Sequence, residues 1–217
     1  FIFILMGITF GLGSGATTVI AQFIGSKDKK NADNAANHTI IIGLLISIII
    51  VIIGFMYGDK LLKIQGADDA TIIMALDFFY IMIYGSIFMI LPIFFRSIMS
   101  GAGEMMFPMI VLGIGTIINI ILDPFLIYYY KIAGAALATI ISQMIVTFIF
   151  IYFLFFNKKS YISFNLNSFK FNFIIIKKIF YLGVPASLSM VRNINKLVFC
   201  QLMFIYPLHK ECHRLRV

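Results

Sequence analysis

Two polar side chains that could bind a cation lie inside a run of mostly apolar residues. Asn119 and Asp123 interrupt the stretch from Ile114 to Tyr128, which is apolar enough to cross a bilayer. Residues four apart share one face of a helix, so the amide and the carboxylate would be stacked on that face. A carboxylate inside a membrane span costs at least ~3 kcal/mol to insert, and it usually faces an ion, a partner or water. The pair is therefore a candidate site for a proton or a metal cation.

Two structural alternatives remain open for Asp123. It could satisfy helix packing by bonding Thr139 or a backbone group. Because Pro124 follows it, it could also lie at a helix break and bond freed carbonyl groups when protonated. Asn119 and Thr139 taken alone are typical of the polar residues that join membrane helices. They become candidate ligands only together with Asp123.

The composition predicts an all-α polytopic membrane protein. The chain has 217 residues, of which 61% are hydrophobic and 12% are charged, and its mean hydropathy is +1.02. A soluble domain of this size could not cover its surface with so few charges. The apolar runs are continuous over about twenty residues, which fits helices, whereas barrel strands would alternate apolar and polar residues. The two cysteines are too few for a disulfide framework or a Cys-rich metal site.

Six apolar segments are long enough to cross a hydrocarbon core about 30 Å thick. They cover residues 1–24, 35–57, 70–95, 107–130, 132–156 and 179–206. Most Lys and Arg residues fall in the loops after the first, third and fifth segments, so the positive-inside rule predicts that these loops face the cytoplasm. The net charge of +8 has the same explanation. Since no Lys/Arg run alternates with exposed aromatic residues, we expect no nucleic-acid partner.

Several other features have ordinary structural explanations. Gly7, Gly11 and Gly15 recur every four residues and predict a close helix contact, since the context of a phosphate-binding loop is absent. His38 is predicted to be a surface residue, because no His or Glu partners suggest a metal site. Pro92 can kink the third segment.

Five sequence motifs follow one another along the chain: Thr9–Gly25, Arg96–Glu104 followed by Pro108, Asn119–Pro124, Gly134–Gln143 and Gly183–Ala186. In that order they resemble the second helix, the helix 4–5 junction, the fifth and sixth helices and the opening of the seventh helix of the MATE family of multidrug and toxic compound extrusion transporters. The resemblance covers about residues 9–190. It implies helices two to six of a six-helix lobe in residues 1–156, a cytoplasmic linker in residues 157–178 and the start of a second lobe in residues 179–217.

The resemblance also implies a function and a site. The family consists of secondary antiporters, not enzymes, which export cationic or amphipathic drugs and toxins in exchange for Na⁺ or H⁺. The matching cation site would comprise Asn119, Asp123, Thr139 and the backbone carbonyl of Ala135. Na⁺ is a hard cation that prefers such oxygen ligands. If protons are used instead, Asp123 would be the carrier.

We therefore expect a multi-pass protein of the cell membrane that needs no cofactor besides the coupling ion. Its expected partners are small-molecule drugs and the lipid bilayer, and at full length we expect a monomer. The chain begins at Phe1 rather than Met, the family's first helix with its acidic residue is missing, and the end beyond Met190 departs from the family. We expect a fragment or a truncated or frameshifted product.

Three other functions stay open. A lipid-linked oligosaccharide flippase of the same superfamily would use central cations, for which only Arg192 and Lys196 are candidates. An intramembrane enzyme would need a second catalytic group beside Asp123. A truncated transporter would have no function, because one lobe cannot provide alternating access.

Overall fold

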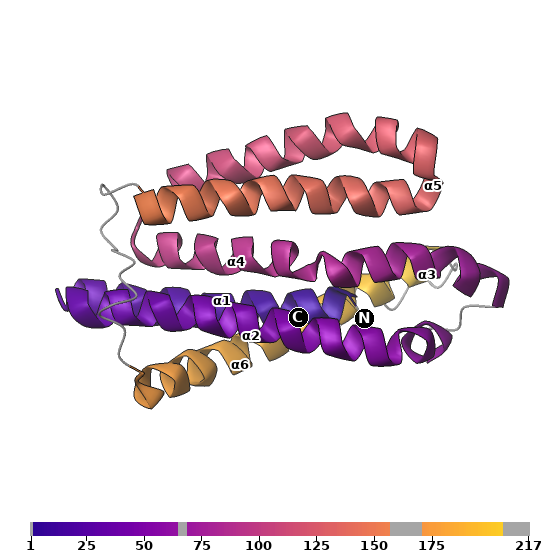
Figure 1. Cartoon of the computed structure of the whole chain (residues 1–217). Coiled ribbons are helices and arrows are strands. Elements are labelled where there is room, and N and C mark those ends of the chain that lie inside the picture. The colour runs from indigo at the N-terminus through magenta and orange to yellow at the C-terminus, as the bar shows by residue number, and fades with distance from the viewer. Residues whose placement is uncertain (1, 65–68, 157–170, 206–217) are drawn as a thin grey trace.

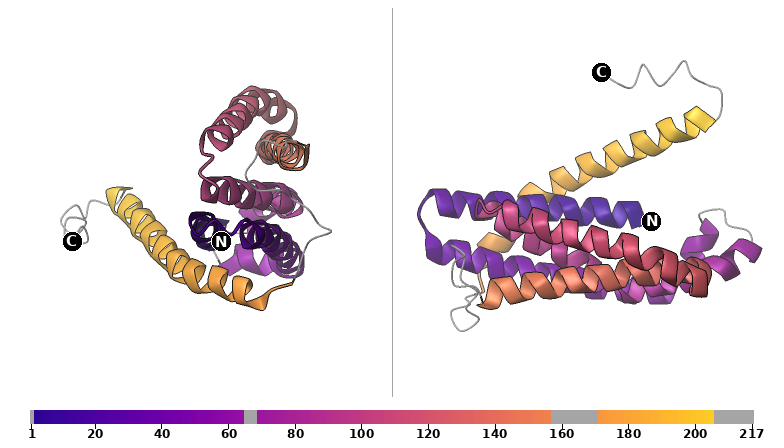
Figure 2. Two further views of the ribbon diagram at one scale, coloured as in Figure 1. Left: turned by 90° about the vertical axis from the view of Figure 1, so that its left-hand side faces the viewer. Right: turned by 90° about the horizontal axis from the view of Figure 1, so that it is seen from above.

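A computed structural model describes residues 2–64, 69–156 and 171–205, and all regular structure in these ranges is helical. The helices are α1 (Ile2–Gly25), α2 (Lys29–Ile64), α3 (Asp69–Tyr84), α4 (Ser86–Gly101), α5 (Met106–Phe156) and α6 (Phe173–Ile205). Helices α1 to α5 lie lengthwise side by side, and α6 crosses α1 obliquely (Figure 1 and Figure 2). This arrangement confirms the predicted all-α class.

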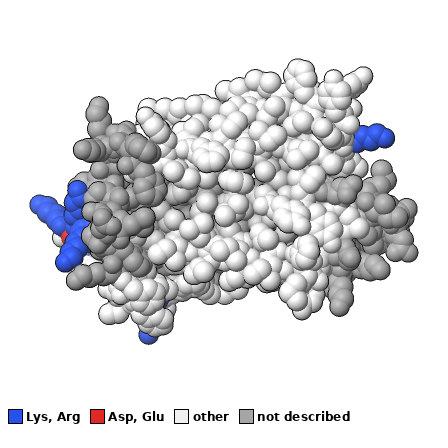
Figure 3. Space-filling model, viewed as in Figure 1, with Lys and Arg blue, Asp and Glu red and all other residues white. Residues whose placement is uncertain are grey.

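The helices have the length and surface of membrane spans. Within the described ranges, four helices are long and apolar enough to cross a bilayer, or five if the bent pair α3 and α4 forms one span. Large apolar side chains such as Leu45, Phe55 and Phe125 are exposed, as expected of residues that face lipid. On the face shown in Figure 3, Lys and Arg lie toward the ends of the molecule and the surface between them is uncharged.

The connections alternate between the two ends of the bundle. The α1–α2 and α4–α5 turns and the start of α6 lie at one end, whereas the end of α2, the start of α3 and the turn within α5 lie at the other (Figure 1). This order matches the predicted alternation of loops. The assignment of the first end to the cytoplasm remains a prediction from the positive-inside rule.

The third predicted segment is broken rather than continuous. Helices α3 and α4 meet at Gly85 at an angle of 48°. A Cβ at Gly85 would overlap the side chain of Ile140, so glycine is required for the close approach of α5. Pro92, the predicted kink position, lies buried inside α4 without breaking that helix. The bend is therefore set by a Gly–Ser pair, another common cause of kinks.

Helix α5 is a hairpin of two antiparallel arms. The chain reverses at Lys131, whose φ of 52° and ψ of −127° are not helical. Beyond the turn, Gly134 packs so closely on the carbonyl of Leu126 that a Cβ there would overlap it. Farther along, Gly115 of the first arm faces Val146 of the second. The two arms correspond to the fourth and fifth predicted segments.

The glycine face of α1 packs directly on α6. A Cβ at Gly11 would overlap Ser187, and a Cβ at Gly15 would lie 2.7 Å from the backbone nitrogen of Gly183. The Ser187 hydroxyl lies 3.1 Å from the carbonyl oxygen of Ile8 and joins the two helices across 179 residues of sequence. The predicted small-residue contact is confirmed.

The prediction that His38 lies at the surface was wrong. His38 is only 1% exposed, and its ring contacts Phe171 and Asn172, the two residues that precede α6. Its Nδ1 lies 2.7 Å from the carbonyl oxygen of Asn34, and its Nε2 accepts the backbone N–H of Asn172 at 3.1 Å. These partners require the neutral ring with its proton on Nδ1. The ring thus links α2 to the residue that precedes α6.

Candidate cation site in the α5 hairpin

The hairpin brings the four predicted site residues onto two facing arms. Asn119 and Asp123 lie on the first arm, and Ala135 and Thr139 lie on the second. Because Gly134 packs against Leu126 and the arms are antiparallel, Asp123 and Thr139 lie within about one helical turn of each other along the hairpin. The sequence predicted that Asn119 and Asp123 share one helix face and that Ala135 and Thr139 share another. The turn at Lys131 brings the two arms that carry these faces together.

The two groups of the second arm are already paired with each other. The Thr139 hydroxyl donates to the carbonyl oxygen of Ala135 at 2.9 Å. This bond holds the hydroxyl oxygen and the carbonyl oxygen side by side, and both keep lone pairs that could accept a cation. Asp123 is half-buried, and no hydrogen bond in the described ranges joins it to the other three residues. The candidate ligands therefore lie on the two arms of α5, and none of the other three bonds directly to the carboxylate of Asp123.

Asn119 has an unsatisfied polar atom. Its Nδ2 is buried and makes no hydrogen bond among the described residues. A buried unpartnered group of this kind destabilises a fold by about 1–3 kcal/mol. A half-turn of the amide would present the carbonyl oxygen at the same place, so the position fits an oxygen ligand for a hard cation.

Of the structural alternatives for Asp123, the helix break and the bond to Thr139 are not found among the described residues. Helix α5 continues through Pro124 and breaks only at Lys131, so Asp123 does not lie at a helix break. Thr139, the suggested packing partner, bonds Ala135 instead. No group of three His, Cys, Asp or Glu side chains that could hold a metal ion occurs in the described ranges. Any cation held here would therefore depend on amide, hydroxyl and carbonyl oxygens besides the one carboxylate.

The other candidate cations do not join this site. Arg192 is an exposed residue of α6, and the side chain of Lys196 lies outside the described residues. Arg96 of α4 packs instead over the ring of Phe10 of α1, with its guanidinium carbon 5.3 Å from the ring centre.

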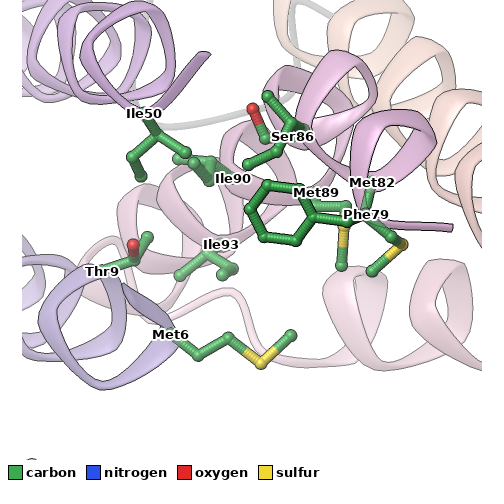
Figure 4. Close-up of a pocket in the computed structure, with 10 residues that line it drawn as sticks. Met6, Thr9, Ile50, Phe79, Met82, Ser86, Met89, Ile90 and Ile93 are labelled. Atoms are coloured by element: carbon green, nitrogen blue, oxygen red, sulfur yellow. The ribbon is translucent and has the colours of Figure 1, made fainter. Parts of the chain in front are cut away.

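Sequence reasoning missed a second polar position, at the break between α3 and α4. Residues of α1, α2, α3 and α4 line a pocket there, and Ser86 is one of them (Figure 4). The signal available in the sequence was the pair Gly85–Ser86, a combination that often interrupts membrane helices.

A lengthwise bundle of apolar helices with polar groups held inside it defines a multi-pass membrane protein. Comparison with known families then gives the identity. The MatE family matches residues 1–125, more than half of the chain, and the protein belongs to this family of transporters, the MATE family.

Similar proteins agree with that assignment. Multidrug export protein MepA of Staphylococcus aureus (strain MRSA252) is 30% identical over 190 residues, which cover 87% of this chain and 42% of the relative. The probable multidrug resistance protein YoeA of Bacillus subtilis (strain 168) is 28% identical over 198 residues, again 87% of this chain and 42% of the relative. The chain thus spans about two-fifths of the length of these curated relatives.

Solved structures show the same fold. An inward-facing multidrug resistance MATE family transporter of the MOP superfamily matches with a TM-score of 0.84 and 30% identity, over 87% of this chain and 43% of that one. A MATE crystal structure in complex with MaD3S matches with a TM-score of 0.87 and 29% identity, over 91% of this chain and 45% of that one. The recognition of the family from the five motifs is confirmed.

Proposed function

We propose that the protein acts in a secondary antiporter that exports cationic or amphipathic drugs and toxins in exchange for Na⁺ or H⁺. Membership of the MATE family carries this proposal, and the names of the relatives, a multidrug export protein and a probable multidrug resistance protein, support it. The α5 hairpin supplies a physical basis for coupling ion movement to drug export, because it carries one carboxylate and several oxygen atoms that could bind a cation within apolar spans.

The coupling ion would bind between the two arms of α5. Asp123 would supply the charge, Asn119 an amide oxygen, and Thr139 with Ala135 the paired hydroxyl and carbonyl oxygens. With H⁺ as the coupling ion, the carboxylate of Asp123 would take the proton and the other three groups would position it. The membrane potential would contribute about 2.3 kcal/mol per charge for each 100 mV.

The lobes would be organised as the resemblance implies. Residues 1–156 would form the first lobe, residues 157–178 a cytoplasmic linker and residues 179–217 the start of a second lobe. The close crossing of α1 and α6 would then be a contact between lobes, which alternating access would have to preserve as a pivot or open. The protein would lie in the cell membrane as a monomer when full length.

The test measures coupled efflux of a fluorescent organic cation from vesicles that contain the complete protein carrying this sequence. An imposed Na⁺ or H⁺ gradient should drive efflux, and Asp123→Asn should abolish the gradient dependence while the protein remains in the membrane. Asp28→Asn is the matched control, because Asp28 lies in the α1–α2 turn outside the spans. Gradient-driven efflux that persists unchanged in Asp123→Asn would refute the proposed site.

A further inference from the structure

Positively charged side chains from two distant segments lie at one end of the bundle. The α1–α2 turn and the start of α2 carry Lys27, Lys29 and Lys30, and the start of α6 carries Lys177 and Lys178. All five residues are exposed. Lys and Arg side chains gather at this end on the face shown in Figure 3, which is viewed as in Figure 1. This end of the molecule is therefore a candidate surface for an anionic partner.

The ring of Phe23 brings the two segments together. The ammonium nitrogen of Lys178 lies 5.5 Å from the centre of this ring, which is a cation–π contact between α6 and the last turn of α1. On the other side, the chain turns back on Phe23, since the backbone N–H of Asp28 donates to its carbonyl oxygen at 2.9 Å. Lys27, within this turn, and Lys178 therefore border the same residue.

No carboxylate among the described residues forms an ion pair with Lys27 or Lys178. Asp28, the acidic residue next to Lys27, instead accepts the backbone N–H of Asn31 at 3.2 Å and its side-chain amide at 2.6 Å. Two ammonium groups near one another repel each other, and an anion between them would turn that repulsion into attraction.

The backbone of Lys27 gives an independent reason to assign a role to its side chain. Its φ of 59° is in the left-handed region, and its N–H donates to the carbonyl oxygen of Ile24 at 2.9 Å to close the end of α1. Glycine usually occupies such a position, because a Cβ is strained there. Lysine makes this turn less stable than glycine would, so the ammonium group rather than the turn explains the residue.

The surface of α6 indicates which kind of anion fits. An open groove along this helix places Phe173, Phe180 and Val184 beside Lys177. The side chains of Phe173 and Phe180 are 68% and 40% exposed. A free phosphate ion would contact only the ammonium groups, whereas a phospholipid would also cover this apolar surface with its acyl chain.

We propose that Lys27 and Lys178 bind the headgroup phosphate of an anionic phospholipid, which bridges the α1–α2 turn and the start of α6. The acyl chain of this lipid lies along the apolar groove of α6, and Lys177 adds to the positive potential at the headgroup. Each lysine has a flexible stem and three donors, so both ammonium groups can reach the oxygens of one phosphate. The site is separate from the cation site and does not rest on the proposed efflux function.

The absence of tryptophan from the chain allows a direct test. Phe23→Trp keeps an aromatic ring beside Lys178 and adds a single fluorophore, and Phe173→Trp is a second reporter in case the first disturbs α1. The 217-residue chain is reconstituted in mixtures of phosphatidylglycerol and phosphatidylcholine, one of which is brominated near the glycerol end of its acyl chains. Quenching at several lipid ratios gives the relative binding constant. We expect phosphatidylglycerol to be favoured about 25-fold, because each lysine contributes about fivefold.

Substitution of the lysines tests the site in the Phe23→Trp background. Lys27→Gly and Lys178→Gln should each lower the preference for phosphatidylglycerol about fivefold. Lys27→Gly also relieves the left-handed backbone, so its unfolding temperature should be unchanged or up to about 4 °C higher, which separates lost binding from misfolding. Lys131→Gly is the matched control. Lys131 is also exposed and has a φ of 52°, but it forms the turn of α5 at the opposite end of the bundle, so the preference should not change.

Equal quenching by the two lipids at both reporters would overturn the proposal, because the lysines would then serve only to orient the protein in the membrane. A preference that survives in the double variant of Lys27→Gly and Lys178→Gln, or that Lys131→Gly lowers equally, would also overturn it. Displacement of the lipid by inorganic phosphate, but not by chloride at the same ionic strength, would identify a soluble anion as the ligand instead. Because no ion gradient or drug is present, the result is independent of the Asp123→Asn experiment.

Discussion

The hydroxyl of Thr147 lies 3.1 Å from the carbonyl oxygen of Phe88. That carbonyl would normally accept the N–H of residue 92, but residue 92 is proline and has none. The same hydroxyl lies 2.7 Å from the carbonyl oxygen of Gln143 in its own helix. Thr147 on α5 thus shares its single proton between the two carbonyl oxygens and partly compensates for the bond that Pro92 removes from α4.

This relationship predicts that Thr147→Val destabilises the protein. Valine has the same shape but no donor, so the carbonyl of Phe88 is left without its partner. The expected loss is about 0.6–2 kcal/mol in the free energy of unfolding, the usual range for a polar contact between membrane helices. The measurement is reversible unfolding in lipid or detergent.

Two controls isolate the effect. Thr116→Val removes an exposed hydroxyl that bonds only Leu112 of its own helix, and it should change stability little. In a Pro92→Ala background, residue 92 regains its N–H, so the loss caused by Thr147→Val should shrink. Equal losses in both backgrounds would show that Thr147 does not compensate for the proline.

Substitution at the crossing of α1 and α6 should separate the two helices. Gly11→Ala adds a Cβ that would overlap Ser187, and overpacking of this kind typically costs about 1–3 kcal/mol. Gly113→Ala adds a Cβ into open space and is the matched control, expected to be neutral or slightly stabilising. Thermal unfolding of the two variants in the same lipid gives the comparison. A Gly11→Ala protein as stable as Gly113→Ala would mean that the close crossing is not maintained.

The attachment of α6 to α2 should depend on His38. In His38→Phe the backbone N–H of Asn172 loses its acceptor, so hydrogen exchange at that amide should quicken about tenfold. The Ile174 amide donates to the side chain of Asn172 instead, so its exchange reports whether the start of α6 itself has loosened. Unchanged exchange at Asn172 would be incompatible with a bond to the imidazole.

The turn between α1 and α2 should show an acid transition. The side chain and backbone N–H of Asn31 both donate to Asp28 and hold the pKa of that carboxyl below its ordinary value of 3.8. Because the pKa is lowered in the folded state, these bonds are fully present above pH 3.8 and are lost as the pH falls through the lowered pKa. The chemical shift of the Asn31 amide should follow this transition. Asn31→Ala should move the carboxyl midpoint upward toward 3.8, and a midpoint that stays in place would show that Asn31 is not the cause.

The length of the apolar runs predicted the spans well, because continuous hydropathy alone decides which segments can cross a bilayer. Features that depend on distant contacts were not predictable in this way. The sequence predicted a kink at Pro92, but α4 stays helical there, where Thr147 of another helix contacts the carbonyl that the proline leaves free. The burial of His38 was missed because the residue that covers it, Asn172, lies 134 residues later.

The same limit applies to the cation site. Spacing within each arm placed Asn119 with Asp123 and Ala135 with Thr139, since helical periodicity is local. It could not show how the arms pack, on which the separation of Asp123 from Thr139 depends. The bond from the Thr139 hydroxyl to the carbonyl of Ala135, by contrast, is local to one helix.

A last prediction separates stability from function at Asn119. Its buried Nδ2 has no partner in the described part of the structure, so Asn119→Leu removes an unsatisfied group and should leave the unfolding temperature unchanged or raise it. The same variant should weaken the dependence of efflux on the coupling cation, because an oxygen ligand is lost. Asn37, which also has an unsatisfied buried atom but lies on α2, provides the control, since Asn37→Leu should leave the ion dependence intact. If Asn119→Leu instead destabilises the protein and the ion dependence survives, Asn119 is a packing residue and the coupling site must be sought elsewhere.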